Sequence, residues 1–489
     1  MSCITRRQII KQSALASGSF FIAKNLSSCG NASDAVRVAV VGFREKGGRG
    51  EEHIKAFNTS RHARIVALCD VNKTCLDHQA TALKSAGTEV KTYQDIRKLL
   101  ESKDIDAISI ATPNHWHSLA GIWAMQAGKD VYVEKPVSHN VWEGRQLVNA
   151  ARKYNKIVQT GSQCRSSSAL RDAVAWVKAG NIGKIQIARG LCYKRRDAIG
   201  SSKEALATPS EIDLDLWLGP APSEPIHRRK LDYDWHWQWA YGNGDLGNQG
   251  VHQMDIARWF LGENEIAPQA WSIGGRLSYE DDGETPNTQI VYQAYKSAPL
   301  IFEVRGLPKT KDAPKAKDNS DMDEFNGTRI GCIIHCEGGH IVVPSYTEAI
   351  AFDKNGSKIK SWKGSEDHFE NFIKAVKSRK REDLNADVLE GHLSAAICHT
   401  GNISYRLGEK QGVAEIKKSI ESQAGAGETF DRMVQHLEAN GVDLKATPLT
   451  LGPMLQFDTK SEKVIGNEAA AKLMTREYRA PFVVPEIKV

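Results

Sequence analysis

Lys135 is the side chain whose place in the sequence indicates chemistry most directly. The apolar run 131–133 is typical of a buried strand, and Glu134, Lys135 and Pro136 follow it at once. An ammonium group at the end of such a strand can stabilise the alkoxide that develops when a hydroxyl-bearing carbon loses a hydride. A solvated Glu–Lys pair on a surface loop is the alternative, but the position after an apolar strand favours a catalytic lysine.

Three further polar side chains, Asn248, His252 and Asp255, have the spacing of one helix face. An imidazole can take or give a proton at neutral pH, so His252 is a candidate acid/base, and a core or surface histidine is the alternative. Asn248 can orient a hydroxyl or the imidazole, although an amide cannot stabilise an imidazolium as a carboxylate would. We predict that the three residues share the catalytic site with Lys135.

A glycine-rich segment follows the predicted strand 38–41 and leads into a predicted helix. Backbone can approach a pyrophosphate where side chains are absent, and a helix N-terminus adds N–H donors and a positive dipole end. We therefore expect a dinucleotide to lie against Gly42, Gly48, Arg49 and Gly50. The loop is longer than a plain GxGxxG turn, so this motif needs support from elsewhere in the chain.

Asp70 provides that support, because it ends the second predicted strand. An acid there can accept hydrogen bonds from the adenosine ribose and repel a 2′-phosphate, which predicts NAD rather than NADP. Arg44 or Arg49 could instead favour a phosphate, so NADP stays open. A helix N-cap is the alternative role for Asp70, and one carboxylate could serve both.

An aromatic stretch at residues 234–239 holds three tryptophans and one histidine. Ring faces suit sugar C–H groups and polar tips suit hydroxyls, so Trp235 and His236 are candidates for substrate contact. A buried aromatic cluster is the alternative.

Short apolar runs alternate with helical segments from residue 36 onward, at 36–41, 65–68, 105–111, 131–133 and 157–160. This alternation predicts an α/β fold that begins with a parallel, doubly wound Rossmann domain at residues 36–160. Strand-like runs at 185–193, 289–295, 300–304, 331–336 and 340–343 predict a second α/β domain at 161–424 with a large, mostly antiparallel open sheet. Residues 425–489 are a C-terminal extension, whose end, with Pro481 and Pro485, predicts an extended strap at 475–489.

The first 28 residues have the features of an export signal: Arg6 and Arg7 precede a mildly apolar stretch at 13–23, which is similar to a twin-arginine signal. Cys29 ends a segment that resembles a lipobox, so we expect a periplasmic protein with a lipid anchor as one option. A basic N-terminus with a chance arginine pair is the alternative.

The remaining 461 residues are nearly neutral, because the chain's net charge is +6 and much of the excess lies in those first 28 residues. We therefore expect no nucleic-acid partner. The cysteines show no CxxC spacing, and Cys332 and Cys336 lie in an apolar run, so no metal site is expected.

The glycine loop, the Glu134-Lys135-Pro136 segment and the Asn248–Asp255 segment, in this order, resemble the Gfo/Idh/MocA family of nicotinamide-dependent sugar oxidoreductases, and the resemblance covers about residues 36 to 410. It implies that Lys135 hydrogen-bonds the reacting hydroxyl while Glu134 and Pro136 hold the turn beside the nicotinamide. The family commonly has Asp where this chain has Asn248, which puts its usual pH behaviour in doubt.

The resemblance also assigns residues that the patterns alone do not. It implies cofactor contacts from Thr112, Pro113, Asn114, His117, Glu134 and Gln163, although Pro113 and Asn114 also suit a turn before a helix. It implies that Arg165, Tyr193 and Lys194 face the substrate cleft, and that the protein is a homo-oligomer.

These observations predict an enzyme that oxidises or reduces a CH–OH group of a sugar or glycoside, with Lys135 polarising the hydroxyl and His252 moving its proton. An exported enzyme would need a tightly bound NAD that is recycled in place. An NAD-dependent glycosidase working through a transient 3-keto sugar is the rival enzyme, and Lys135 argues modestly against it, since family members of that kind tend to carry another residue there. A non-catalytic NAD- and sugar-binding protein is the third alternative, because of Asn248.

Overall fold

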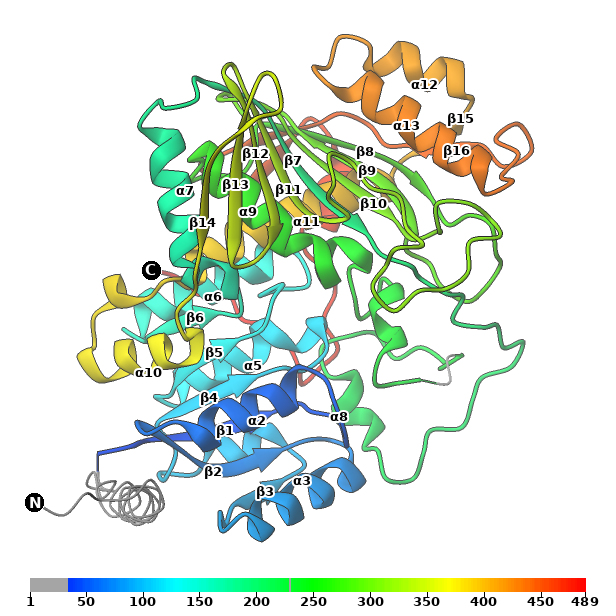
Figure 1. Ribbon diagram of the computed structural model, residues 1–489. Helices are drawn as coiled ribbons and strands as arrows, with labels where there is room; N and C mark the ends of the chain where they lie inside the picture. The colour runs from blue at the N-terminus through cyan, green and yellow to red at the C-terminus, as the bar shows by residue number, and fades with distance from the viewer. Residues whose placement is uncertain (1–33, 228–229) are drawn as a thin grey trace, which may run out of the picture.

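The computed structural model describes residues 34–227 and 230–489, so the predicted export signal and Cys29 lie outside the described residues. Two sheets form the framework: a parallel sheet near the N-terminus and a larger one above it in Figure 1. The predicted α/β fold with these two kinds of sheet is confirmed. Within the described ranges, no helix combines the length and apolar character that crossing a bilayer requires.

The first sheet has the strand order β3-β2-β1-β4-β5-β6, and every neighbouring pair is parallel. This is the order of a Rossmann sheet, which binds its ligand at the carboxyl ends of the strands. Its strands are β1 Val36–Val41, β2 Ala63–Cys69, β3 Lys91–Tyr93, β4 Ala107–Ile110, β5 Asp130–Val133 and β6 Val158–Thr160, and its helices are α2 Arg49–Thr59, α3 Lys73–Ser85, α4 Ile96–Leu100, α5 Asn114–Gln126 and α6 Val141–Lys153.

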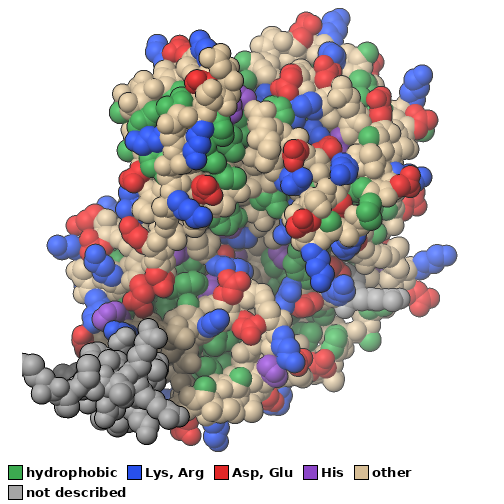
Figure 2. Space-filling model, in the orientation of Figure 1, with side chains coloured by type: hydrophobic (Ala, Val, Ile, Leu, Met, Phe, Trp, Pro, Cys, Tyr) green, Lys and Arg blue, Asp and Glu red, His purple; other side chains and the backbone are tan. Residues whose placement is uncertain are grey.

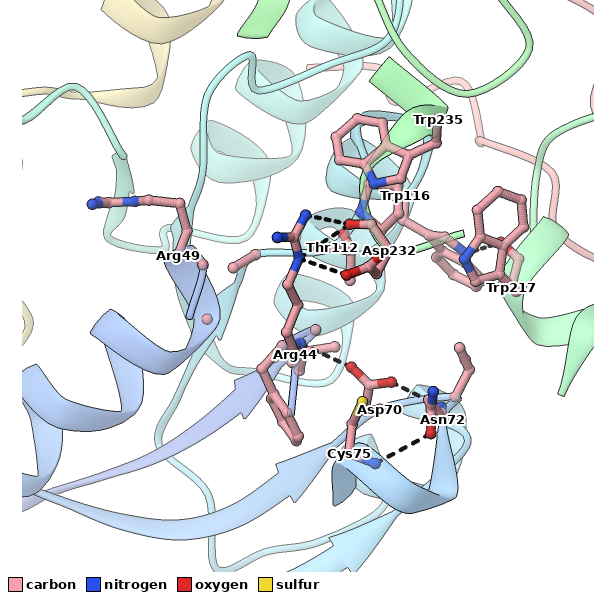
Figure 3. A pocket seen from close by; sticks show the side chains of 18 of the residues that line it. Arg44, Arg49, Asp70, Asn72, Cys75, Thr112, Trp116, Trp217, Asp232 and Trp235 are labelled. Carbon is pink, nitrogen blue, oxygen red and sulfur yellow. Dashed lines mark hydrogen bonds and ion pairs between the residues drawn. The ribbon is translucent and has the colours of Figure 1, made fainter. Parts of the chain in front are cut away.

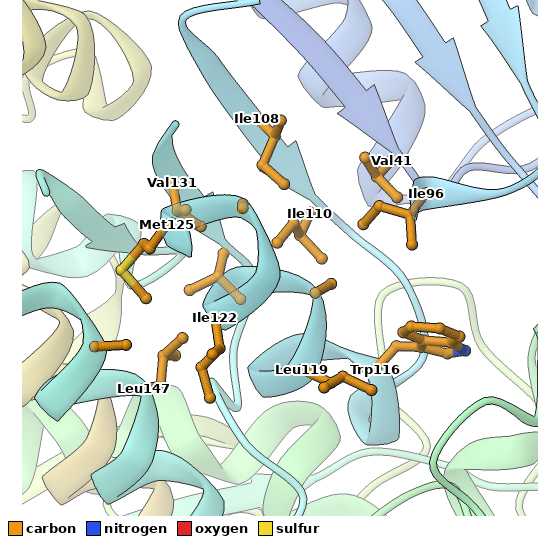
Figure 4. Close-up of a cluster of buried hydrophobic side chains, with 14 of the residues drawn as sticks. Val41, Ile96, Ile108, Ile110, Trp116, Leu119, Ile122, Met125, Val131 and Leu147 are labelled. Carbon is orange, nitrogen blue, oxygen red and sulfur yellow. The ribbon is translucent and has the colours of Figure 1, made fainter. Parts of the chain in front are cut away.

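Helices cover both faces of this sheet, so its central strands β1, β4 and β5 are mostly apolar and buried. On one face Ile110, Ile122, Val131 and Leu147 pack together between the strands and helices α5 and α6 (Figure 4). On the other face α2 and α3 are joined by α10 (His368–Ser378), whose Phe372 is fully buried. Burying one such side chain contributes about 1.5–3 kcal/mol. The core fixes the strand ends that carry the candidate site.

The second sheet has twelve strands, and all its pairs are antiparallel except β7 with β10. Helices α9 and α11 pack on the face toward the first domain. The strands are β7 Ile185–Tyr193, β8 Gln269–Gly275, β9 Thr288–Gln293, β10 Leu300–Arg305, β11 Ile330–Cys336, β12 Gly339–Ser345, β13 Glu348–Asp353, β14 Lys358–Lys363, β15 Glu409–Gln411, β16 Leu449–Leu451, β17 Leu455–Asp458 and β18 Lys463–Ile465. The helices that follow β6 are α7 Ser168–Lys178, α8 Leu214–Leu218, α9 Val251–Leu261, α11 Val388–Arg406, α12 Val413–Ile420, α13 Ala426–Ala439 and α14 Glu468–Leu473, together with α10, whose bounds are given above.

Helices α12 and α13 lie on the opposite face of the second sheet (Figure 1). A buried ion cluster holds α13 against the sheet. The carboxylate of Glu303 accepts hydrogen bonds from Arg432 on α13 at 2.7 and 2.9 Å and from the Tyr193 hydroxyl at 2.7 Å. A buried carboxylate needs such partners, because an unpaired one would cost several kcal/mol. The cluster therefore ties the C-terminal extension to the sheet.

The last residues form the predicted strap, without helix or strand, along the first domain. Phe482 is fully buried, and its ring contacts Trp116 and Trp123 on α5 at centroid distances of 5.6 and 6.2 Å. Arg479 donates to the carbonyl oxygen of Gly219 at 3.0 Å, just after α8. The strap thus joins the first domain to the segment around α8.

We predict that Phe482→Ala lowers stability by about 3–5 kcal/mol, the usual cost of removing a buried ring. The urea midpoint of unfolding measures this. Val483→Ala is the matched control, because Val483 is 47% exposed and should leave the midpoint unchanged. Equal midpoints for Phe482→Ala and the native chain would contradict the role of the strap.

Candidate active site

A cavity of about 650 Å³ lies at the carboxyl ends of β1, β2, β4 and β5, and the segment 231–236 covers it. Its size is that of a small-molecule site. The predicted residues that line it are Gly42, Gly48, Arg49, Gly50, Asp70, Thr112, Pro113, Asn114, His117, Glu134, Lys135, Trp235, His236 and Asn248. Most of the predicted cofactor residues therefore meet at one site (Figure 3).

The glycine loop leaves a helix N-terminus open toward this cavity. Gly48 is the N-cap of α2 with φ +84°, and no side chain caps the helix. The first N–H groups of α2 therefore lack a capping side chain, as an anion-binding helix end requires. Gly42 has φ +81°, and a Cβ on it would lie 2.7 Å from the Thr112 nitrogen. Glycine at this position lets the loop pass close to the Thr112 backbone.

Asp70 holds the loop rather than capping a helix. Its Oδ2 accepts from the Phe43 N–H and its Oδ1 from the Asn72 N–H, both at 2.8 Å. Asn72 is the N-cap of α3, since its side chain accepts from the Cys75 N–H, so the N-cap interpretation of Asp70 is wrong. Burial raises the pKa of Asp70 to about 6, although the two N–H groups oppose the shift.

The two arginines of the loop point in different directions (Figure 3). Arg44 crosses the cavity mouth: its guanidinium donates to the Asp232 carbonyl oxygen at 2.6 Å and lies over the Tyr233 ring at 5.0 Å. Arg49 donates to Glu134 Oε1 at 3.0 Å. Both guanidinium groups are therefore engaged with protein groups.

The segment after β4 contributes polar groups on the opposite wall. The Thr112 hydroxyl is buried without a hydrogen-bond partner among the described residues. Asn114 donates to Asn243 Oδ1 at 3.0 Å. The ring nitrogens of His117 lie 2.8 Å from the Thr112 carbonyl and 2.6 Å from the Pro136 carbonyl, so this imidazole connects the wall to the Lys135 turn.

Lys135 lies where β5 ends, with its amine at the inner end of the cavity. The Nζ donates to the Asn248 carbonyl oxygen at 2.6 Å. Burial lowers the pKa of Lys135 to about 8; Glu134 opposes this shift, and Arg49 and Lys194 add to it. A lysine with that pKa can exchange a proton near neutral pH.

His252 lies close to Lys135 but differs from our expectation in charge. Burial, and next the Lys135 ammonium, lower the pKa of His252 to about 3, so the expectation that this imidazole titrates near neutral pH is wrong. Its Nδ1 is buried without a partner among the described residues, and its ring contacts Tyr346 at 4.9 Å. At neutral pH His252 is therefore an uncharged imidazole.

His252 and Asp255 lie three residues apart on one helix, as predicted, but Asn248 precedes that helix. A π-helical turn, Leu246–Gly250, holds Asn248, and α9 begins only at Val251. Asp255 faces away from the cavity, where Arg165 binds both its oxygens at 2.8 and 2.9 Å and Ser394 donates to it at 2.6 Å. The predicted roles of Asp255 in catalysis and of Arg165 in substrate binding therefore have no support in this geometry.

Tyr193 also faces away from the cavity: at the end of β7 its hydroxyl donates to Glu303 on the outer face of the sheet. Lys194 does not line the cavity, but its charge lowers the pKa of Lys135. The expectation that both residues face the cleft is wrong for Tyr193. Gln163 lies beside the turn, with its Nε2 3.4 Å from Glu134 Oε1.

The aromatic stretch forms part of the cavity wall. Trp235 and His236 line it, and their rings stack at a centroid distance of 3.6 Å. Trp237 is buried and lies under the Arg196 guanidinium at 4.9 Å. Trp235 and His236 therefore have the positions expected for a sugar platform, whereas Trp237 fits the alternative of a buried aromatic cluster.

Sequence patterns miss some residues that the structure brings to the site. His53 on α2 and Ser109 on β4 lie under Glu134, and Tyr346 from the turn after β12 covers His252. For His53 the sequence offers one local indication of a role at the site, its position on the helix three residues after Gly50. Tyr346 has none, because only the second sheet brings it there.

The fold and this cavity define an NAD-binding Rossmann protein with a second α/β domain. The first domain matches the model described as "Oxidoreductase family, NAD-binding Rossmann fold" at residues 36–162, and the second matches "Oxidoreductase family, C-terminal alpha/beta domain" at residues 177–314. Together the two models match more than half of the sequence. The chain belongs to the Gfo/Idh/MocA oxidoreductase family.

Curated relatives match over part of their length. Levoglucosan dehydrogenase of Pseudarthrobacter phenanthrenivorans is 28% identical over 184 residues, which are 38% of this chain and 40% of that enzyme. A glycosyl hydrolase family 109 protein of Shewanella putrefaciens is 33% identical over 128 residues, 25% of this chain and 27% of that protein. The matched part of the chain thus spans less than half of either relative.

Solved structures resemble the whole two-domain fold. The WlbA dehydrogenase from Bordetella pertussis, in complex with NADH and UDP-GlcNAcA, has a TM-score of 0.54 at 19% identity and covers 76% of this chain and 97% of its own. A putative NADPH-dependent oxidoreductase from Desulfitobacterium hafniense has a TM-score of 0.56 at 13% identity, covering 76% and 96%. These likenesses confirm the fold.

We predict that Asp70→Ser weakens NAD binding relative to NADP by about tenfold or more, since it removes a charge that repels a 2′-phosphate. In the native chain this discrimination should fall as the pH drops through about 6, where the carboxyl gains a proton. Titration of both dinucleotides across pH measures it. Unchanged selectivity in Asp70→Ser would show that Asp70 only supports the loop.

Proposed function

We propose that this protein is an NAD-dependent oxidoreductase that acts on a CH–OH group of a sugar or glycoside. The observation that carries the proposal is the Lys135 amine at the inner end of the dinucleotide-sized cavity, 2.6 Å from the Asn248 carbonyl oxygen and with its pKa lowered to about 8. A proton-exchanging amine beside a nicotinamide site is what oxidation of an alcohol requires.

The residues around the cavity fit NAD. The uncapped N-terminus of α2 suits the pyrophosphate, and Asp70 lies where ribose hydroxyls bind. The buried Thr112 hydroxyl, without a partner among the described residues, has room for a ligand hydrogen bond. Bound NAD supplies the acceptor for the hydride.

Lys135 carries the proton chemistry at the hydroxyl. In its neutral form the Lys135 amine accepts the hydroxyl proton, while its hydrogen bond to Asn248 keeps it in place. His252 is not among the residues that line the cavity, so its uncharged imidazole bears on the reaction only as a neighbour of Lys135. In the reverse direction the Lys135 ammonium returns the proton.

The substrate class follows from the remaining wall. The stacked Trp235 and His236 offer a ring face for a sugar, and Lys194 adds a cation near the reacting end. Levoglucosan dehydrogenase as a relative supports a carbohydrate substrate.

Export by a twin-arginine route to the periplasm is part of the proposal, with Cys29 as the site of an optional lipid anchor. The arginine pair at Arg6 and Arg7 supports it. An exported redox enzyme would carry tightly bound NAD and recycle it in place, because free dinucleotide is not supplied there.

The test is to release bound nucleotide by denaturation and to incubate the native protein with sugars and glycosides, followed by mass spectrometry. Near-stoichiometric NAD(H) and a keto-sugar product support the proposal. Bound nucleotide without any product would indicate a binding protein instead, and protein that is empty and binds NAD weakly would contradict the tight-cofactor argument.

A second candidate is an NAD-dependent glycosidase, which relatives described as glycosyl hydrolase family 109 proteins favour at 32–33% identity. In that reaction a transient 3-keto sugar acidifies the neighbouring C–H, so that the glycosidic bond breaks by elimination. A released aglycone with no net change of NAD in the same incubation identifies this activity.

We predict that Lys135→Ala lowers kcat by at least about a hundredfold, the effect of losing a preorganised group at the developing alkoxide. NAD should stay bound, because the loop and Asp70 are unchanged. Lys84→Ala is the matched control, because Lys84 is exposed on α3 and does not line the cavity. Near-native turnover in Lys135→Ala would exclude the role given to Lys135.

We predict that Lys194→Gln moves the pH profile of oxidation. Oxidation needs the neutral Lys135 amine, so the rate rises as the pH passes through the Lys135 pKa of about 8. Without the Lys194 charge that pKa increases, and the rising limb moves to higher pH. A limb at the same pH in both proteins would show that another group accepts the proton.

A further inference from the structure

Glu134 is a buried carboxylate whose two oxygens are both occupied. Its Oε1 lies 3.0 Å from Arg49 Nη2, 3.1 Å from His53 Nε2 and 3.4 Å from Gln163 Nε2. Its Oε2 accepts from the backbone N–H of Lys135 at 3.3 Å. The carboxylate is thus part of the turn that carries the Lys135 amine.

His53 connects this carboxylate to the interior of the first domain. The ring is fully buried, its Nδ1 lies 2.8 Å from the Ser109 hydroxyl on β4, and its edges contact Tyr132 and Phe369 at 5.1 Å. Because an ionised carboxylate can only accept, Nε2 carries the hydrogen toward Glu134, and Nδ1 accepts from Ser109. Burial lowers the pKa of His53, which agrees with this neutral form.

Glu134 has little freedom to move away from His53. A Cβ on Gly161 would lie 2.6 Å from Glu134 Oε1, so the chain after β6 closes against the carboxylate. The Arg49 guanidinium holds the pKa of Glu134 well below its usual range, even though burial alone would raise it. The group is therefore ionised and confined.

We propose that His53 and Ser109 are positioning residues that act through Glu134: the chain Ser109–His53–Glu134 fixes the Lys135 amine against the reacting hydroxyl. This inference rests on the proposed function, because it assigns Lys135 to the reaction. Neither His53 nor Ser109 lines the cavity, so neither touches the substrate or the cofactor.

Glu134 affects the pKa of Lys135 through its charge, in addition to fixing the position of the Lys135 turn. Glu134 raises the pKa of Lys135, against burial and against the cations nearby. The titratable and charged groups that face Lys135 are Glu134, Arg49 on α2, Lys194 after β7, Cys398 on α11, His117 on α5, His236 before Trp237 and His252 on α9. If Glu134 loses the hydrogen bond from His53, it can move away from Lys135 or gain a proton. The Glu134 charge then no longer raises the pKa of Lys135, so that pKa falls.

The experiment compares His53→Leu, His53→Gln and Ser109→Ala in the full chain loaded with NAD. Reaction of the Lys135 amine with an acylating reagent across pH, quantified by mass spectrometry, measures its pKa without turnover. We expect His53→Leu to lower that pKa by about one unit, the scale of a lost opposite charge. We expect kcat to fall between about tenfold and a hundredfold, the cost of a misplaced catalytic group.

The two other variants separate positioning from packing. Gln places an amide donor near the Nε2 position, so His53→Gln should restore the Lys135 pKa and most of kcat. Ser109→Ala removes the donor that fixes the His53 tautomer and should shift both quantities in the direction of His53→Leu; it also carries the test if His53→Leu fails to fold. His62→Leu is the matched control, because His62 is an exposed histidine.

An unchanged Lys135 titration in His53→Leu and Ser109→Ala overturns the inference. Equal losses in His53→Leu and His53→Gln also overturn it, because they indicate packing alone. If the native protein turns over no sugar but His53→Leu still shifts the Lys135 titration, the proposed function fails, and the part of the inference that stands is the control of the Lys135 amine by the chain Ser109–His53–Glu134.

Discussion

The ionised carboxylate of Glu134 is the interaction on which the site depends. Keeping one anion inside a protein requires charged and hydrogen-bonded partners on every side. Here the partners come from two separate parts of the chain: Arg49 and His53, one turn apart on the helix after the glycine loop, and Gln163 beyond β6. The same carboxylate accepts from the Lys135 backbone. The dinucleotide loop and the catalytic turn therefore cannot be arranged independently.

The Lys135 turn that Glu134 holds also connects the first domain to the second. The Lys135 amine crosses to the second domain and donates to the Asn248 carbonyl oxygen in the π-helical turn before α9. A π-turn shifts the direction of the residues that follow it. It exposes the Asn248 carbonyl to Lys135, while His252 lies one turn later beside Tyr346.

The first domain could be predicted from the sequence because its signals are local. Each strand is a short apolar run, and Asp70 and Lys135 stand directly at strand ends, where α/β folds bind ligands. The third strand carries no such signal: β3 takes the polar residues Lys91–Tyr93, in a segment of helix-tolerant composition, and α4 begins only after the N-cap Asp95. Pairing with β2 overrides helix propensity there.

The second domain was less predictable because its contacts join distant segments. Arg165 and Asp255 are 90 residues apart, and no spacing indicates that they neutralise each other. Tyr193 could have been placed by the alternation of strand faces. Strand β14 lacks an apolar run because it lies at the sheet edge, where Lys358, Lys360 and Lys363 are exposed.

The C-terminal strap has a consequence for the order in which the protein can be completed. Phe482, Val484 and Ile487 belong to the core of the first domain, although they follow the second sheet in the sequence. When a ribosome has synthesised residues 36–160, Trp116 and Trp123 still lack the Phe482 ring that packs against them. The packing of the domain that holds the dinucleotide is therefore complete only after residues 482–487 have been made.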